Sequence, residues 1–163
     1  LVYRNPQATG TPPLAIAKRL HGRLPILYSA SDHLAAVNVR WRGQISENAK
    51  QLAYGHVLPE MNHNEIVGWN ANRSLMKKMT VVFIRDRGTH PRVQLREEIT
   101  KKIIKSYASD VLEVRSEGRS LLARIMSLVY LGDWVSYYLA ILNKQNPTPV
   151  KAIEYLKGEL AKA

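Results

Sequence analysis

Two side chains that can divide acid and base work lie sixteen residues apart, Glu47 in an amphipathic segment and His63 in a polar loop. A carboxylate and an imidazole can move protons on and off a substrate at neutral pH. Each also has a plain structural interpretation. Glu47 can be a solvated glutamate near a helix end, and His63 can be a loop histidine beside Asn64, a residue type that caps helices.

The segment around Glu47 predicts a helix that starts at Ser31 or Asp32 and continues to about Lys50. One stripe of it is apolar and another is small or polar. The apolar stripe comprises Leu34, Val37, Trp41 and Ile45, and the other comprises Ala36, Arg40, Gly43 and Glu47. Glu47 therefore points away from the core of its own domain. The small neighbours would let a second domain or a ligand approach it, with Arg40 available on the same side to contact a ligand.

A further helix is expected after Pro149, and it carries two lysines, Lys151 and Lys157. Its apolar stripe is formed by Val150, Ile153 and Leu160. Lys157 falls on this stripe, whereas Lys151 lies about 100° away. A lysine on a packed face either lays its stem along apolar surface or points toward an anion. Packing of the stem along apolar surface is the default interpretation.

Other site chemistries find little support in the sequence. A metal site can be drawn from His56, His63 and Glu65, but His56 is expected in a strand and the spacing matches no zinc pattern. Glycine-rich phosphate loops, G-x-S-x-G and H-E-x-x-H are not found in the 163 residues. We therefore expect neither a metal nor an organic cofactor.

Composition limits the possible classes of protein. The 163 residues suit one domain, 45% hydrophobic and 23% charged, with a formal net charge of +11. A surface this basic attracts anions such as nucleic acids, anionic lipids or phosphorylated metabolites, or it compensates an acidic neighbouring domain. No apolar run approaches 18 residues and the start is unlike a signal peptide, so we expect no membrane span. The absence of cysteine fits a cytoplasmic location.

Short apolar runs alternate with helical stretches along the chain. The runs at 24–28, 53–58, 79–84 and 111–114 read as strands, and helices are expected at 14–20, 31–50, 64–69, 92–109, 120–142 and 150–160. This order predicts an α/β protein of the flavodoxin-like class, a parallel sheet of four to five strands with helices on both faces. We assign residues 1–22 to a lead-in or interdomain linker with a first helix, and 23–163 to the domain.

In such sheets ligands bind outside the carboxyl ends of the strands. Three loops are expected there, Ser29–Asp32, Pro59–Glu65 and Arg85–Pro91. We therefore expect the chemistry of the chain at this edge of the sheet.

Four segments carry a family resemblance. They are R-W-x-x-Q-I-x-E-N-A-K from Arg40, P-E-M-N-H-N-E-I-V-G-W from Pro59, L-G-D-W-V-S-Y-Y-L-A from Leu131 and N-P-T-P-V-K-A-I-E-Y-L-K from Asn146. Together they resemble the C-terminal half of the bifunctional phosphoglucose/phosphomannose isomerases, members of the sugar isomerase (SIS) superfamily. The resemblance covers most of residues 23–160.

The resemblance implies aldose–ketose isomerisation of glucose or mannose 6-phosphate through a cis-enediol. Glu47 matches the base that moves a proton between C2 and C1. His63 matches a histidine that helps open the sugar ring and is supplied across a homodimer interface. A C-terminal lysine would assist ring opening; its helical face favours Lys157 over Lys151, and the choice between them stays open. Thr148 would lie near C2–C3 of the sugar.

In that family the serine- and threonine-rich loops that hold the phosphate belong to a first SIS domain, and nothing in this chain resembles it. We therefore expect very low activity from the chain alone, because phosphate binding positions the sugar. Two other functions compete with the isomerase. One is a sugar-phosphate-binding SIS module without catalysis, and the other is a basic nucleic-acid-binding domain. Neither needs the trio of Glu47, His63 and a C-terminal lysine.

Overall fold

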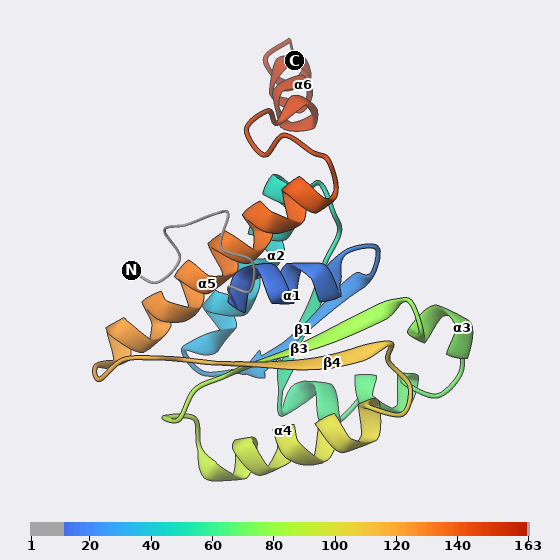
Figure 1. Cartoon of the computed structure of the whole chain (residues 1–163), viewed down its shortest axis with the longest axis vertical. Helices are drawn as coiled ribbons and strands as arrows, with labels where there is room; N and C mark the ends of the chain where they lie inside the picture. Colours follow the sequence, from blue (N-terminus) through green and yellow to red (C-terminus); the bar gives the residue numbers. More distant parts are fainter. Residues whose placement is uncertain (1–11, 163) are drawn as a thin grey trace.

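Four parallel strands form one sheet in the order β2-β1-β3-β4 (Figure 1). The computed structural model describes residues 12–162, so most of the lead-in that we assigned to the first residues lies outside the described part. The strands are β1 (Leu24–Ala30), β2 (Tyr54–Leu58), β3 (Met79–Arg85) and β4 (Asp110–Arg115). The predicted parallel α/β sheet is confirmed, with four strands in the flavodoxin-like order.

Helices cover both faces of the sheet, as predicted (Figure 1). One face is covered by α1 (Pro12–Leu20), α2 (Leu34–Ala49) and α5 (Leu121–Leu142). The other face is covered by α3 (Arg73–Met76), α4 (Pro91–Ile104) and the 3₁₀ turns η1 (Glu60–Asn62) and η2 (Glu65–Gly68). Because successive side chains of β1 and β3 enter opposite layers and nearly all are buried, these strands are almost continuously apolar in sequence.

The helix that carries Glu47 is held firmly by its apolar stripe. Its four predicted members are all buried, and the Trp41 indole donates a hydrogen bond of 2.8 Å to the Leu128 carbonyl of α5. Gly132 lies directly against this indole, since a Cβ built on it would be 2.3 Å from the Trp41 Nε1. The contact between α2 and α5 therefore needs glycine at residue 132.

α5 is strongly apolar along its length, and the structure shows that it is a helix of the protein core. By length and mean composition it is apolar enough to cross a membrane, although Arg124 and Asp133 interrupt its apolar runs. In the structure Leu128, Val135 and Leu139 are buried in the same core cluster as α2. That cluster also contains Ala17 and Leu20 of α1, the helix that we had grouped with the lead-in. α5 therefore behaves as a central helix of this layer, and α1 packs into the same core.

The last helix, α6 (Lys151–Leu160), forms where it was predicted but does not pack as expected. All ten of its residues are exposed, and Figure 1 shows it standing away from the sheet and its covering helices. The apolar stripe that we expected to be packed thus meets no core among residues 12–162. This difference matters for the lysines that α6 carries.

Helix boundaries differ from the prediction by a few residues, for local reasons. α2 begins at Leu34 with His33 as its N-cap residue, and the Oδ1 of the preceding Asp32 accepts a hydrogen bond of 2.9 Å from the Leu34 backbone N–H. α4 ends at Ile104 instead of continuing to Ser109, because residues 105–109 turn into β4. The short helical segment near Asn64 is the 3₁₀ turn η2, and the Asn64 side chain caps it.

Candidate functional site

Glu47 lies on the wall of a surface pocket of about 470 Å³. It is exposed near the C-terminal end of α2, as predicted from the helical face. Ser46 and Lys50 line the same wall, and nothing lies within 4 Å of where a Cβ on Gly43 would be. A ligand or a second protein surface can therefore approach the Glu47 carboxylate along this side of α2.

The opposite wall of the Glu47 pocket comes from the segment that leads into α6. It is formed by Gln145, Asn146, Pro149, Val150, Lys151, Ala152 and Ile153. The Lys50 ammonium ties the two walls together, donating a hydrogen bond of 3.2 Å to the Pro147 carbonyl. One wall of the pocket is thus the firmly packed end of α2. The other is the segment between α5 and α6, which is held mainly through its connection to α5.

Three predicted residues lie around this pocket without all lining it. Lys151 lines it, whereas Lys157 lies further along the exposed α6. Thr148 is exposed in the preceding turn, where its backbone N–H donates to Asn146 Oδ1 at 3.0 Å, and its side chain is not among those lining the pocket. Of the two α6 lysines, Lys151 is therefore the one that lines the same pocket as Glu47.

Arg40 does not point into the Glu47 pocket. Its guanidinium makes two hydrogen bonds, of 3.0 and 3.1 Å, to the Asp133 carboxylate of α5, and Gln44 donates to the same carboxylate. Arg40 and Glu47 share a helix face, but two helical turns separate them by about 10 Å. The structure therefore gives Arg40 a partner within its own domain.

His63 lies in a second, smaller pocket at the carboxyl end of β2. This pocket has a volume of about 250 Å³ and is lined by Pro59, Glu60, Asn62, His63 and Arg96. The imidazole is exposed, and no hydrogen bond of its ring to another residue within 12–162 is found. It is available to a ligand or to another chain.

The loop that carries His63 is fixed on both sides of the exposed ring. On one side Asn62 donates a hydrogen bond of 2.7 Å to Thr100 of α4. On the other, Glu65 accepts hydrogen bonds from Tyr54, at 2.9 Å, and from the buried Tyr28. Burial raises the pKa of Tyr28, and its bond to Glu65 raises it further, so the phenol stays a donor. Sequence reasoning missed these anchors, because two of them, Asn62 to Thr100 and Tyr28 to Glu65, join segments 38 and 37 residues apart in the chain.

Glu47 and His63 lie near opposite ends of the strands, Glu47 at the amino ends and His63 at the carboxyl ends. α2 runs antiparallel to β1, so Glu47 is near the amino ends of the strands, whereas His63 follows the carboxyl end of β2. β2 alone, five residues long, spans about 16 Å between them. The expected location at the carboxyl edge is right for His63 and wrong for Glu47. One copy of the chain does not bring these two side chains together.

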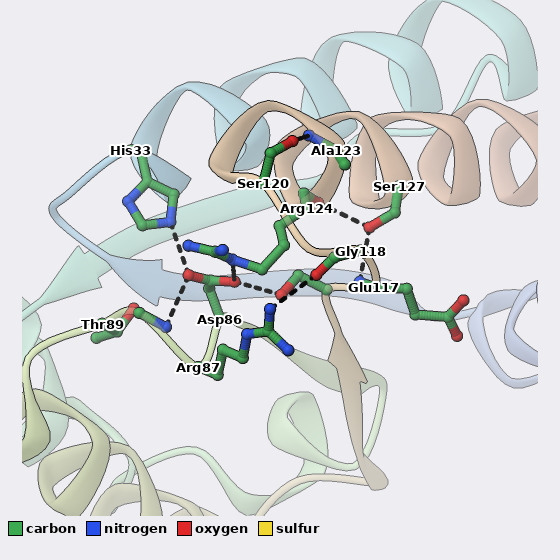
Figure 2. Close-up of polar contacts among 12 residues, drawn as sticks. His33, Asp86, Arg87, Thr89, Glu117, Gly118, Ser120, Ala123, Arg124 and Ser127 are labelled. Carbon is green, nitrogen blue, oxygen red and sulfur yellow. Dashed lines mark hydrogen bonds and ion pairs between the residues drawn. The ribbon is translucent and has the colours of Figure 1, made fainter.

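The carboxyl ends of β1 and β3 are closed by a network around Asp86 (Figure 2). The fully buried Asp86 carboxylate binds His33 at 3.1 Å and Arg124 at 2.8 Å, and it also accepts hydrogen bonds from Ser116 and the Gly88 backbone. Burial alone would raise the pKa of Asp86, but the bonds from Ser116 and Arg124 outweigh it and lower the pKa to about 2. The polar groups of this edge are thus largely committed to one another.

The imagined metal ligands do not converge. His56 has its Nδ1 beside the backbone of Val57, and Glu65 is taken by the two tyrosines. No group of three metal-ligating side chains occurs among the described residues, 12–162.

Comparison with known proteins gives a consistent family. Residues 10–160 match the model of the bacterial phospho-glucose isomerase C-terminal SIS domain. The chain is 46% identical over 149 residues to the bifunctional phosphoglucose/phosphomannose isomerase of Aquifex aeolicus, covering 90% of this chain and 45% of that protein. It is 46% identical over 143 residues to the enzyme of the same name from Caldicellulosiruptor bescii, covering 88% of this chain and 42% of that protein. The chain thus spans less than half the length of these relatives.

A solved structure agrees with this comparison. A glucose-6-phosphate isomerase like protein from Thermus thermophilus superposes with a TM-score of 0.71 at 26% identity, covering 84% of this chain and 45% of that one. The fold and the sequence matches thus point the same way. The chain belongs to the family of bacterial phospho-glucose isomerase C-terminal SIS domains.

Proposed function

We propose that this chain is the catalytic C-terminal half of a cytoplasmic phosphoglucose/phosphomannose isomerase that interconverts glucose or mannose 6-phosphate and fructose 6-phosphate. The observation that carries the proposal is the placement of Glu47. Its carboxylate lies exposed on the wall of a pocket, on a helix whose other face is fixed in the core. Relatives that are 46% identical bear the name of this isomerase.

In the proposed reaction Glu47 acts on the open-chain sugar. Its carboxylate takes the proton from C2 of the aldose while O1 gains a proton, which gives a cis-enediol. The carboxylic acid then returns the proton to C1 as O2 loses its proton, and the 2-ketose forms. General base catalysis of this kind contributes about 10²- to 10⁴-fold in rate. The open space beside Gly43 lets the sugar approach the carboxylate.

His63 and a C-terminal lysine have the proposed task of opening the sugar ring. Because Glu47 and His63 of one chain lie near opposite ends of the strands, we infer that the active site forms in a homodimer. His63 would be supplied by the partner chain. The sugar phosphate would be held by an N-terminal SIS domain, which fits a chain that spans 45% of its Aquifex aeolicus relative. Either lysine of α6 fits this scheme, and Thr148 would lie near C2–C3 of the sugar.

The test uses the chain alone and the chain joined to an N-terminal SIS half, from its own upstream sequence or from the Aquifex aeolicus relative. We refer to the second form as the joined protein. Formation of glucose and mannose 6-phosphate from fructose 6-phosphate is followed by coupled assays. We expect turnover from the joined protein and almost none from the chain alone, since phosphate binding positions the sugar.

Substitution Glu47→Gln in the joined protein should lower kcat about a thousandfold. Thermal unfolding should be unchanged, because the side chain is exposed. Glu154→Gln, which removes a carboxylate from α6, serves as the control. An active Glu47→Gln protein would exclude Glu47 as the base. Stabilisation by fructose 6-phosphate with no turnover in the joined protein would instead favour a sugar-phosphate-binding module, and salt-sensitive binding to duplex DNA would favour a nucleic-acid-binding domain.

A further inference from the structure

The His63 pocket contains a second cationic side chain, Arg96 of α4. No hydrogen bond or ion pair joins its guanidinium to another of residues 12–162, and the residue is exposed. The pocket also contains one acidic side chain, Glu60, whose Oε1 accepts a hydrogen bond of 3.0 Å from Asn64. Arg96 therefore presents a permanent positive charge beside a free imidazole.

The stretch of α4 that carries Arg96 is held in place by contacts of its neighbouring residues. The next residue, Glu97, is buried and binds the Arg85 guanidinium of β3 at 2.8 Å. Thr100, one turn later, accepts the hydrogen bond from Asn62, the neighbour of His63. The bond between Asn62 and Thr100 thus holds α4 and the His63 loop together, so Arg96 and His63 lie in fixed positions relative to each other.

We propose that Arg96, beside His63, makes an additional contact to the phosphate of the sugar in the active site of the partner chain, where the N-terminal SIS domain holds that phosphate. This inference rests on the proposed isomerase function. In a pyranose 6-phosphate the phosphate is carried on C6, which is bonded to C5, and C5 bears the ring oxygen. A group beside the imidazole that opens the ring is therefore within reach of the phosphate. A guanidinium can bind a phosphate with two parallel hydrogen bonds.

The first test compares Arg96→Ala with wild type in the joined protein. Loss of a hydrogen bond to a charged group costs roughly 1.5–3 kcal/mol, so KM for fructose 6-phosphate should rise about 10- to 100-fold while kcat changes little. Inorganic phosphate should inhibit competitively with a KI raised by a similar factor, and Arg96→Lys should restore part of the affinity. Arg92→Ala, on the same helix but not lining the His63 pocket, should leave KM unchanged.

The second test asks which chain supplies Arg96. Mixed dimers of Glu47→Gln and Arg96→Ala chains contain one intact site if Arg96 acts on the partner's Glu47 pocket. When the two chains are mixed in equal amounts, half of the dimers contain one chain of each kind, and one of the two sites in each of these dimers is intact. The mixture should therefore show about one quarter of wild-type activity at low substrate concentration. Dimers of Glu47→Gln and His63→Ala provide the parallel experiment for the histidine.

The outcomes separate the two proposals. Recovery with His63→Ala but not with Arg96→Ala, or an unchanged KM in Arg96→Ala, would overturn the role of Arg96 and leave the isomerase proposal intact. A fall in kcat with KM unchanged would also contradict phosphate binding by Arg96. Inactivity of the wild-type joined protein, or no recovery in either mixture, would overturn the shared site itself, and the inference about Arg96 with it.

Discussion

The two helices that border the Glu47 pocket, α2 and α6, are held in very different ways. α2 buries a full stripe of side chains and hydrogen-bonds to α5, whereas α6 has ten exposed residues and meets the body mainly through its connecting segment. Isolated helices as short as α6 are marginal in water. One wall of the pocket is therefore held by packing within residues 12–162, whereas the helix that continues the other wall has no such packing there.

The largest expected effect is a difference in stability between two matched glycine-to-alanine substitutions, one at the contact of α2 with α5 and one on α6. Gly132→Ala pushes a methyl group into the Trp41 indole and should lower the free energy of unfolding by about 2–3 kcal/mol. Gly158→Ala on α6 meets no atom within 4 Å, so the global transition should move by less than about 0.5 kcal/mol, although the helix itself gains propensity. Urea unfolding measures both, and equal losses would contradict the difference between the helices.

Acid should weaken the layer that contains α2 through Asp86, which links His33 before α2 to Arg124 of α5. Because its folded pKa is lowered to about 2, Asp86 stabilises the protein above its unfolded pKa, and this contribution is lost as the pH falls through about 2. It amounts to about 2 kcal/mol at pH 6.

The measurement is the difference in unfolding free energy between wild type and Asp86→Asn. The part due to ionisation should fall to about half between pH 6 and pH 3. Glu154→Gln, on the exposed α6, should show no such dependence. A difference for Asp86→Asn that is constant with pH would contradict the lowered pKa.

The smallest expected effect concerns the two lysines of α6. If α6 docks by its apolar stripe when the N-terminal half is present, Lys157→Met should lower kcat/KM of the joined protein about tenfold, near 1.4 kcal/mol, and Lys151→Met much less. The reverse result would show that α6 works in the orientation described here, where Lys151 lines the pocket with Glu47. Both side chains are exposed, so thermal unfolding should not change in either variant.

The sequence predicted those parts of the molecule that depend on local periodicity. The four strands follow from short apolar runs, and the buried stripe of α2 and the outward direction of Glu47 follow from spacings of three to four residues. The position of α6 did not follow, because an apolar stripe shows that a helix packs but not against which surface. The partners of Arg40 and of the His63 loop could not be predicted either. Asp133 and Thr100 are distant in the chain and are brought close only by the packing of α5 and α4.

The three tryptophans lie in different regions of the protein, so their fluorescence can report on each region separately. Trp41 is buried between α2 and α5, and Trp69 is buried behind the His63 loop with its indole bonded to the Tyr28 hydroxyl at 2.9 Å. Trp134 is only partly buried and stacks edge-on with Tyr137 on α5, with ring centroids 5.7 Å apart. Proteins with single tryptophans would let emission wavelength follow the α2–α5 contact, the His63 loop and the outer side of α5 independently during unfolding or assembly.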